Sequence, residues 1–467
     1  MVLVFVIGYL CIAMEHKFQV NKAAAALLTG GILWVIYVMF MPLSASTVNH
    51  EAFAEFLKNN PSLQSLPLIE QCRHYITELQ IIENLGEIAS TLFFLIGAMT
   101  IVELVDVHDG FSVITEKITS RNKRTLLFII TLITFFMSAV LDNLTTSIVM
   151  VTLIRKIVPN YKERWIFASM IIISANSGGA WSPIGDVTTI MLWIKGKITT
   201  MPLMSSLFIP SVVSTAVPLL FARRMLKGDL KGEVRKLSVE TKEDIIEKNQ
   251  KRALLLLGVF GLLSIPVFKH ITGLPPFVGV LTVLGVLWVY TEFMYKSIHV
   301  GEHLKFRVAK VISRIDTATI LFFLGILLAV MALQATGILK MAGVYLNENV
   351  HNVYAINIII GAFSAIVDNV PLVAVAMGMY PLVDPATLAT VADPSFMQYF
   401  VQDGVFWEFL AYCAGVGGSM LIIGSAAGVV VMGIEKITFT WYLRRFSFIA
   451  LLGYLSGAGV YILSQFL

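Results

Sequence analysis

The sequence contains few charged residues and few cysteines. Only 14% of its 467 residues are Asp, Glu, Lys or Arg, whereas soluble domains average about a quarter. With 57% hydrophobic residues, this composition excludes a soluble globular protein and predicts an all-α polytopic membrane protein. The three cysteines show no metal-ligand spacing and no disulfide framework. The basic residues lie in short loops between apolar segments, so no nucleic-acid-binding surface is expected.

Lys and Arg are distributed unevenly over these loops. Six loops hold 28 of the 34 basic residues, and the positive-inside rule makes these loops cytoplasmic. We therefore expect an integral protein of the bacterial inner membrane with both termini in the periplasm. The six loops are 15–22, 108–125, 155–165, 223–252, 296–316 and 435–446.

Two apolar segments begin and end on the same side of the membrane under this assignment. Residues 126–154 lie between two basic loops, and residues 353–380 lie between two loops that are poor in Lys and Arg. Each segment predicts a re-entrant hairpin, and the two hairpins enter from opposite sides. The alternative, two ordinary spans in place of each hairpin, would put the ten basic residues of 223–252 outside.

Several short patterns occur once in each half of the chain. Ser138-Ala-Val-Leu-Asp-Asn143 matches Ser364-Ala-Ile-Val-Asp-Asn369, and the glycine-containing stretch 176–186 matches 415–425. We expect the stretch 176–186 to be unwound, and weak repeats of inverted topology with such broken helices are typical of secondary transporters. The sequence therefore predicts two inverted repeats, each with a re-entrant hairpin and a broken helix.

The predicted parts have the following limits. The first repeat, 1–222, comprises scaffold helices 1–107, hairpin 126–154, broken helix 166–194 and helix 202–222. A cytoplasmic linker, 223–252, follows. The second repeat, 253–467, comprises scaffold helices 253–336, hairpin 353–380, broken helix 406–434 and helix 440–466.

Polar residues at the hairpin tips and helix breaks predict an ion site. A carboxylate in hydrocarbon costs about 2.5–3.5 kcal/mol, which packing alone seldom repays. Oxygen ligands suit hard cations, so we expect Na⁺ or Li⁺, in competition with H⁺ for the same carboxylates. The predicted cation- and proton-binding residues are Ser138, Asp142, Asn143, Asn176, Asp186, Thr188, Thr189, Ser364, Asp368, Asn369, Ser419 and Ser425.

The first half carries the richer set of ligands. Asp186 corresponds to Ser425 in the second half, and Asn176 corresponds to Gly415. The main Na⁺ site is therefore predicted at Asp142, Asn143, Asn176 and Asp186. The alternative is a purely structural role, in which Asp142, Asp368 and Asp186 only cap the helices that follow them.

These motifs resemble those of NhaD-type Na⁺/H⁺ antiporters of the ion transporter superfamily. The resemblance spans nearly the whole chain. It implies an elevator-type plan, in which each protomer of a homodimer has a scaffold and a moving transport domain. It also implies no cofactor, no enzymatic activity, and Na⁺ or Li⁺ extrusion driven by inward proton flow. The motifs that carry it are Glu15-His-Lys…Val20-Asn-Lys22, Phe94–Glu103, Leu141–Thr146, Ala175–Thr189 and Ile366–Pro371.

Two other functions fit parts of the pattern. The superfamily also contains dicarboxylate and arsenite carriers, but an anion site favours Lys, Arg or open helix N-termini. The hairpins and broken helices lack Lys and Arg, and their aspartates would repel an anion. An intramembrane aspartyl protease would also use two membrane aspartates. Such enzymes carry a Gly-x-Gly-Asp pattern, whose first glycine is replaced here by Pro183.

Overall fold

The chain folds into helices that form two compact units. The computed structural model describes residues 1–48, 51–115, 118, 120–230, 248–295, 308–390 and 393–466, and no β-strand occurs among them. Unit 1 comprises Met1–Phe93, Asp316–Asn352 and Val370–Val383; unit 2 comprises Phe94–Ile315, Val353–Asn369 and Asp384–Leu467. Most of the predicted linker 223–252 and of the basic loop 296–316 lies outside the described residues.

Eight helical segments within the described part of the chain are long and apolar enough to cross a membrane. This confirms the expectation of an all-α integral membrane protein. Five further apolar helices, among them those on either side of Asp368 and of Gly418, are shorter than the roughly 20 residues that a span requires. The eight are Lys22–Phe40, Leu68–Val107, Lys123–Leu141, Thr200–Met225, Lys248–Thr272, Pro276–Tyr295, Thr317–Ala335 and Phe439–Ser464.

Unit 1 is built around the packing of α3 against α17. A Cβ added at Gly30 would lie 2.7 Å from the Gly325 carbonyl oxygen, so small residues let the two backbones touch. Trp34 Nε1 donates to the Leu328 carbonyl at 3.0 Å across the same contact. The helices are α1 Val2–Ala13, α2 Glu15–Phe18, α3 Lys22–Phe40, α4 Ala45–Val48, α5 Glu51–Asn59, 3-10 helix Pro61–Ser65, α6 Leu68–His74, π-helix Tyr75–Gln80, the start of α7 Ile81–Val107, α17 Thr317–Ala335, α18 Ile338–Val350 and nearly all of α20 Asn369–Met379.

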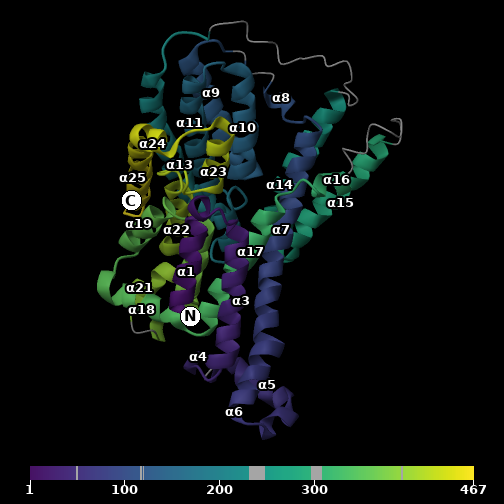
Figure 1. Ribbon diagram of the computed structural model, residues 1–467, viewed down its shortest axis with the longest axis vertical. Helices are drawn as coiled ribbons and strands as arrows, with labels where there is room; N and C mark the ends of the chain where they lie inside the picture. The colour runs from purple at the N-terminus through teal and green to yellow at the C-terminus, as the bar shows by residue number, and fades with distance from the viewer. Residues whose placement is uncertain are drawn as a thin grey trace. The chain divides into compact units, whose positions relative to one another are not determined.

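Unit 2 contains every residue predicted to bind the cation. Its helices α9, α10, α11 and α13 lie side by side, and α22 packs against α11, α19 and α25 (Figure 1). The helices are the rest of α7, α8 Ser112–Thr115, α9 Lys123–Leu141, α10 Asn143–Ile157, α11 Tyr161–Ala180, α12 Val187–Ile194, α13 Thr200–Met225, α14 Lys248–Thr272, α15 Pro276–Tyr295, α16 Val308–Ile312, α19 Val353–Ser364, 3-10 helix Pro385–Thr390, α21 Pro394–Met397, 3-10 helix Gln398–Phe400, α22 Val405–Gly417, α23 Ala426–Glu435, α24 Phe439–Tyr442, π-helix Leu443–Ser447 and α25 Phe448–Ser464.

Matching contacts occur twice in unit 2. Ser138 Oγ donates to the Ala175 carbonyl at 2.6 Å, and Ser364 Oγ donates to the Ala414 carbonyl at 2.7 Å. The glycines behave in the same way: a Cβ at Gly178 would meet the Phe135 carbonyl, and a Cβ at Gly417 would meet that of Gly361. The α9–α11 and α19–α22 pairs are therefore packed through equivalent positions.

The helix breaks are shorter than the sequence suggests. We expected the whole stretch from Asn176 to Asp186 to be unwound, but α11 continues through Ala180 and only 181–186 is non-helical. That part of the expectation is wrong because Gly178 and Gly179 serve close packing rather than unwinding. A Cβ at Gly179 would lie 2.4 Å from the Gly185 carbonyl oxygen, so the break folds back onto the helix end.

Candidate functional site

The junction between α9 and α10 is a single residue, Asp142. Its φ of 74° and ψ of 159° lie in a region that residues other than glycine rarely adopt, and local bonds of its side chain help to hold it there. The carboxylate accepts from Thr145 N at 2.8 Å and from Thr145 Oγ1 at 3.0 Å. Asp142 is therefore the N-cap of α10, in agreement with the capping role considered above, and it lies half-buried beside the site.

Asn143, the first residue of α10, is buried and points into the site. Its Nδ2 donates to Asp186 Oδ2 at 2.7 Å and to Asn176 Oδ1 at 3.0 Å. The Asn176 side chain uses its own Nδ2 to bond to Ser419 Oγ and Ser425 Oγ, both at 3.0 Å. The last two bonds link the two halves of the chain through the side-chain amide of Asn176.

Asp186 is the N-cap of α12 and is only 1% exposed. Its Oδ1 accepts from Thr188 N at 3.0 Å, and Thr189 completes a capping box with the Asp186 backbone. From the second half, Asn369 Nδ2 reaches Asp186 Oδ2 at 3.2 Å. The Asp186 carboxylate thus accepts from two side-chain amides, those of Asn143 and Asn369, and from the N-terminus of α12.

The negative charge of the Asp186 carboxylate is not neutralised by a nearby cationic side chain of the described residues. Among the described residues, no Lys, Arg or His side chain pairs with it, and the charges of Asp142 and Asp368 oppose its own. A buried carboxylate without a cationic partner is costly. The arrangement therefore favours binding of a cation or a proton.

The predicted residues fall into two groups. Asn143, Asn176, Asp186, Asn369 and the two serines of the second half form one hydrogen-bonded network. The other group lies around it: Ser138 and Ser364 bond to backbone carbonyls, Asp142 caps α10, Asp368 is half-buried next to Asn369, and Thr188 and Thr189 are buried in the first turn of α12. No set of three or more His, Cys, Asp or Glu side chains that could hold a metal ion occurs in the described residues.

Two buried hydroxyls escaped the sequence reasoning. Thr146 and Ser147 lie three and four residues after Asn143, hence on the same face of α10, and both are fully buried. Their hydroxyl oxygens have no hydrogen-bond partner among the described residues. The i+3 and i+4 spacing from Asn143 was the available signal, and both hydroxyls are further candidate oxygen ligands.

The chain is similar to proteins of one transporter family. Residues 9–395 match the family described as citrate transporter, CitMHS. Over 99% of its length the chain is 44% identical to sodium/proton antiporter 1 of Arabidopsis thaliana, covering 72% of that protein, and 41% identical to sodium/proton antiporter 2, covering 98%. It is also 28% identical, over 99% of its length and 90% of the relative, to the Na⁺/H⁺ antiporter NhaD of Vibrio cholerae. The chain belongs to the citrate transporter family.

Within this family, the chain is an NhaD-type transporter of the ion transporter superfamily, as the sequence motifs predict. A member of this family is a transporter and not an enzyme, so the protease alternative is set aside.

Proposed function

We propose that the chain exchanges Na⁺ for H⁺ across the membrane, with Asp186 as the central ligand. The observation that carries this proposal is the burial of the Asp186 carboxylate among neutral donors from both halves of the chain. A carboxylate in this setting binds a cation or a proton, and because both neutralise the same charge, one displaces the other. The named Na⁺/H⁺ antiporters among its relatives support the same reaction.

Binding of the cation changes the orientation of the amides. The NH₂ groups of Asn143 and Asn369 now donate to Asp186, and a cation there would repel them. In the Na⁺-bound state these side chains rotate to present their oxygens to the ion, together with Asn176 and Asp142. Li⁺ is a second substrate in this scheme because it is a hard cation with the same preference for oxygen.

The proposed transport cycle uses the predicted architecture. The two inverted repeats contribute one hairpin each, 126–154 and 353–380, and these move with the broken helices past the scaffold helices of a homodimer. We place the protein in the bacterial inner membrane with both termini periplasmic, in accord with the distribution of Lys and Arg.

A dicarboxylate, or the tricarboxylate citrate, is the second candidate substrate, because the matching family is described as citrate transporter. The charge at the site disfavours it. The hairpin and broken-helix segments contain no Lys or Arg, and three aspartates lie near the site. An anion there would require at least one cation to be bound first.

The test uses proteoliposomes with an imposed pH gradient and a pH-sensitive dye. NaCl, LiCl, KCl and citrate are added in turn to wild type, Asp186→Asn and Asp142→Asn. We expect Na⁺ and Li⁺ to collapse the gradient in wild type, no response in Asp186→Asn, and a weakened response in Asp142→Asn. A response to citrate alone, or full Na⁺ exchange by Asp186→Asn, would overturn the proposal.

A further inference from the structure

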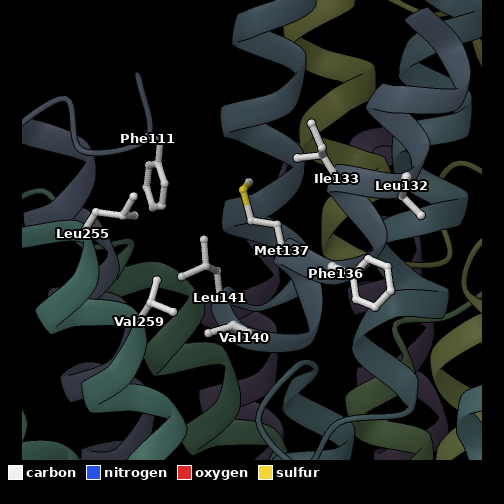
Figure 2. Close-up of a pocket in the computed structure, with 9 residues that line it drawn as sticks. All are labelled: Phe111, Leu132, Ile133, Phe136, Met137, Val140, Leu141, Leu255 and Val259. Atoms are coloured by element: carbon white, nitrogen blue, oxygen red, sulfur yellow. The ribbon is translucent and has the colours of Figure 1, made fainter. Parts of the chain in front are cut away.

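Unit 2 contains a cavity that the proposed ion exchange does not use. It has a volume of about 360 Å³ and lies beside the last turns of α9, facing α14 (Figure 2). Every side chain that lines it is apolar, so it offers nothing to an ion or a sugar and little to water. The lining residues are Phe111, Leu132, Ile133, Phe136, Met137, Val140, Leu141, Leu255 and Val259.

The cavity has a closed wall and an open edge. Met137, Leu141 and Leu255 are at most 9% exposed, and Figure 2 shows them around the space between the two helices. Leu132 and Phe136 on α9 are 46% and 48% exposed. The cavity therefore opens onto an exposed apolar face of the molecule.

This open face is surrounded by hydrocarbon when the protein is in a membrane. Both α9 and α14 are long and apolar enough to span, and α14 also exposes Leu256, Phe260 and Leu263. A void between such helices leaves its lining without contacts on one side, which forfeits dispersion energy. Lipid acyl chains are the apolar molecules present at this depth, and they fill a dry space of this chemistry without a desolvation cost.

A basic cluster lies at one end of the cavity. The first turns of α14 carry Lys248, Lys251 and Arg252, and Leu255 follows one helical turn later, about 6 Å along the axis. Lys251 Nζ also bonds to Asp109 Oδ2 at 3.2 Å, two residues before Phe111. These cations favour a negatively charged group there.

We propose that the cavity binds one acyl chain of an anionic phospholipid, whose phosphate lies at the basic N-terminal turns of α14. The chain packs against Met137 and Leu141. Met137 precedes Ser138, which fixes α9 to α11, and Leu141 precedes Asp142. A bound acyl chain thus supports the final turn of α9 from the cavity side. This binding site is independent of which ion the protein carries.

The proposal is tested by photolabelling. The full chain is reconstituted with phosphatidylglycerol that carries a diazirine in one acyl chain, irradiated, and digested for mass spectrometry. We expect adducts on 132–141 and 255–259 to exceed by several-fold those on the exposed residues Leu281 and Val289 of α15. Equal labelling of the two regions would overturn the proposal, as would chain-to-chain cross-links at the cavity without lipid adducts.

Filling the cavity provides a matched pair of variants. Val259→Trp places an indole in the space, whereas Leu263→Trp adds the same indole to an exposed position of the same helix that does not line the cavity. We expect loss of the α9 adducts only in Val259→Trp, and Leu255→Phe serves if that variant does not fold. Unchanged labelling in a folded, filled variant contradicts the site.

The headgroup is tested separately. Arg252→Glu is expected to reduce labelling by phosphatidylglycerol several-fold and to leave labelling by phosphatidylcholine unchanged. Labelling by a diazirine fatty acid but by neither phospholipid would overturn the assignment to a phospholipid.

Discussion

The amide of Asn369 donates to the carboxylate of Asp186 at 3.2 Å, although the two residues are 183 positions apart in the sequence. Asn369 follows the break between α19 and α20, and Asp186 is the last residue of the break between α11 and α12. Each half thus supplies one end of the bond. The second half of the chain completes the set of hydrogen-bond donors to the Asp186 carboxylate.

This bond leads to the first prediction. Asn369→Ala removes one ligand from the cation and one donor from the carboxylate. A hydrogen bond to a charged group contributes about 1.5–3 kcal/mol, so we expect the half-saturating Na⁺ concentration to rise at least about tenfold. Dye-based exchange assays over a Na⁺ series measure it. Asn349→Ala, at an exposed position of α18, is the control and is expected to match wild type. Unchanged Na⁺ affinity in Asn369→Ala would exclude Asn369 as a ligand.

The second prediction concerns the contact between α9 and α11. A Cβ at Gly178 would lie 2.1 Å from the Phe135 carbonyl oxygen, so Gly178→Ala must push two backbones apart. Overpacking of this kind costs about 1–3 kcal/mol, and we expect a lower melting temperature in detergent. Gly433→Ala is the matched control: it lies in α23 with open space around its Cβ position. There we expect equal or slightly higher stability, because alanine favours a helix over glycine.

The third prediction concerns Glu435 at the end of α23. Its side chain is fully buried, with Arg164 Nε at 2.9 Å and Arg155 Nε at 3.5 Å. Glu435→Gln removes the charge that both arginines bind. The side chains of Arg155 and Arg164 are 54% and 19% exposed and stay hydrated, so the cost is that of losing a hydrogen bond to a charged group, about 1.5–3 kcal/mol. We expect a fall in the melting temperature. Glu163→Gln breaks the more exposed pair with Lys123 and is expected to cost at most about 1 kcal/mol. Similar melting temperatures for the two variants would refute this ranking.

The fourth prediction is a pH dependence of stability. Lys197 lies in the loop between α12 and α13, where burial and then the neighbouring charge of Lys195 lower its pKa to about 8. The unfolded chain binds this proton up to its ordinary pKa of 10.5, so the folded state is disfavoured below about 8 and recovers as the pH rises toward 10.5. The Trp407 ring, 4.3 Å from Lys197 Nζ, offsets part of this cost.

Lys197→Met removes this titration. We expect its melting temperature to exceed that of wild type most below pH 8, with the difference shrinking as the pH approaches 10.5. The exposed Lys340→Met serves as the control, with a constant difference from wild type over the same range. A difference that grows with pH would contradict the assignment.

The composition of the site could be predicted from sequence because polar residues are conspicuous in apolar segments. Asn143, Asn176, Asp186 and Asn369 all stand out for this reason, and the repeat pairs the two halves. The bonding pattern could not be predicted. Asn143 rather than Asp142 contacts Asp186, because the positive φ at Asp142 directs its carboxylate back to Thr145. Adjacent residues in a reversal point in different directions, and sequence spacing does not specify which.

The limits of the helices were similarly predictable in part. Long apolar runs marked the spans well, because burying about 20 apolar residues outweighs local preferences. We predicted too early a start for the break, because glycines such as Gly178 and Gly179 can indicate either an unwound backbone or a close contact between helices. Only the position of Phe135 and Gly185 opposite them decides between the two, and that is a property of the tertiary structure.

The two hydrogen bonds that Asn176 Nδ2 donates to Ser419 Oγ and Ser425 Oγ have a mechanical consequence. Independent sliding of the two broken helices by even a few ångström would break both bonds inside a buried region, and the Arg164–Glu435 pair would be lost with them. The broken helices are thus coupled as one rigid body. If the proposed exchange moves the ion by displacing these helices, the helices move together, and the segments that connect them to the rest of the chain take up the change in backbone conformation.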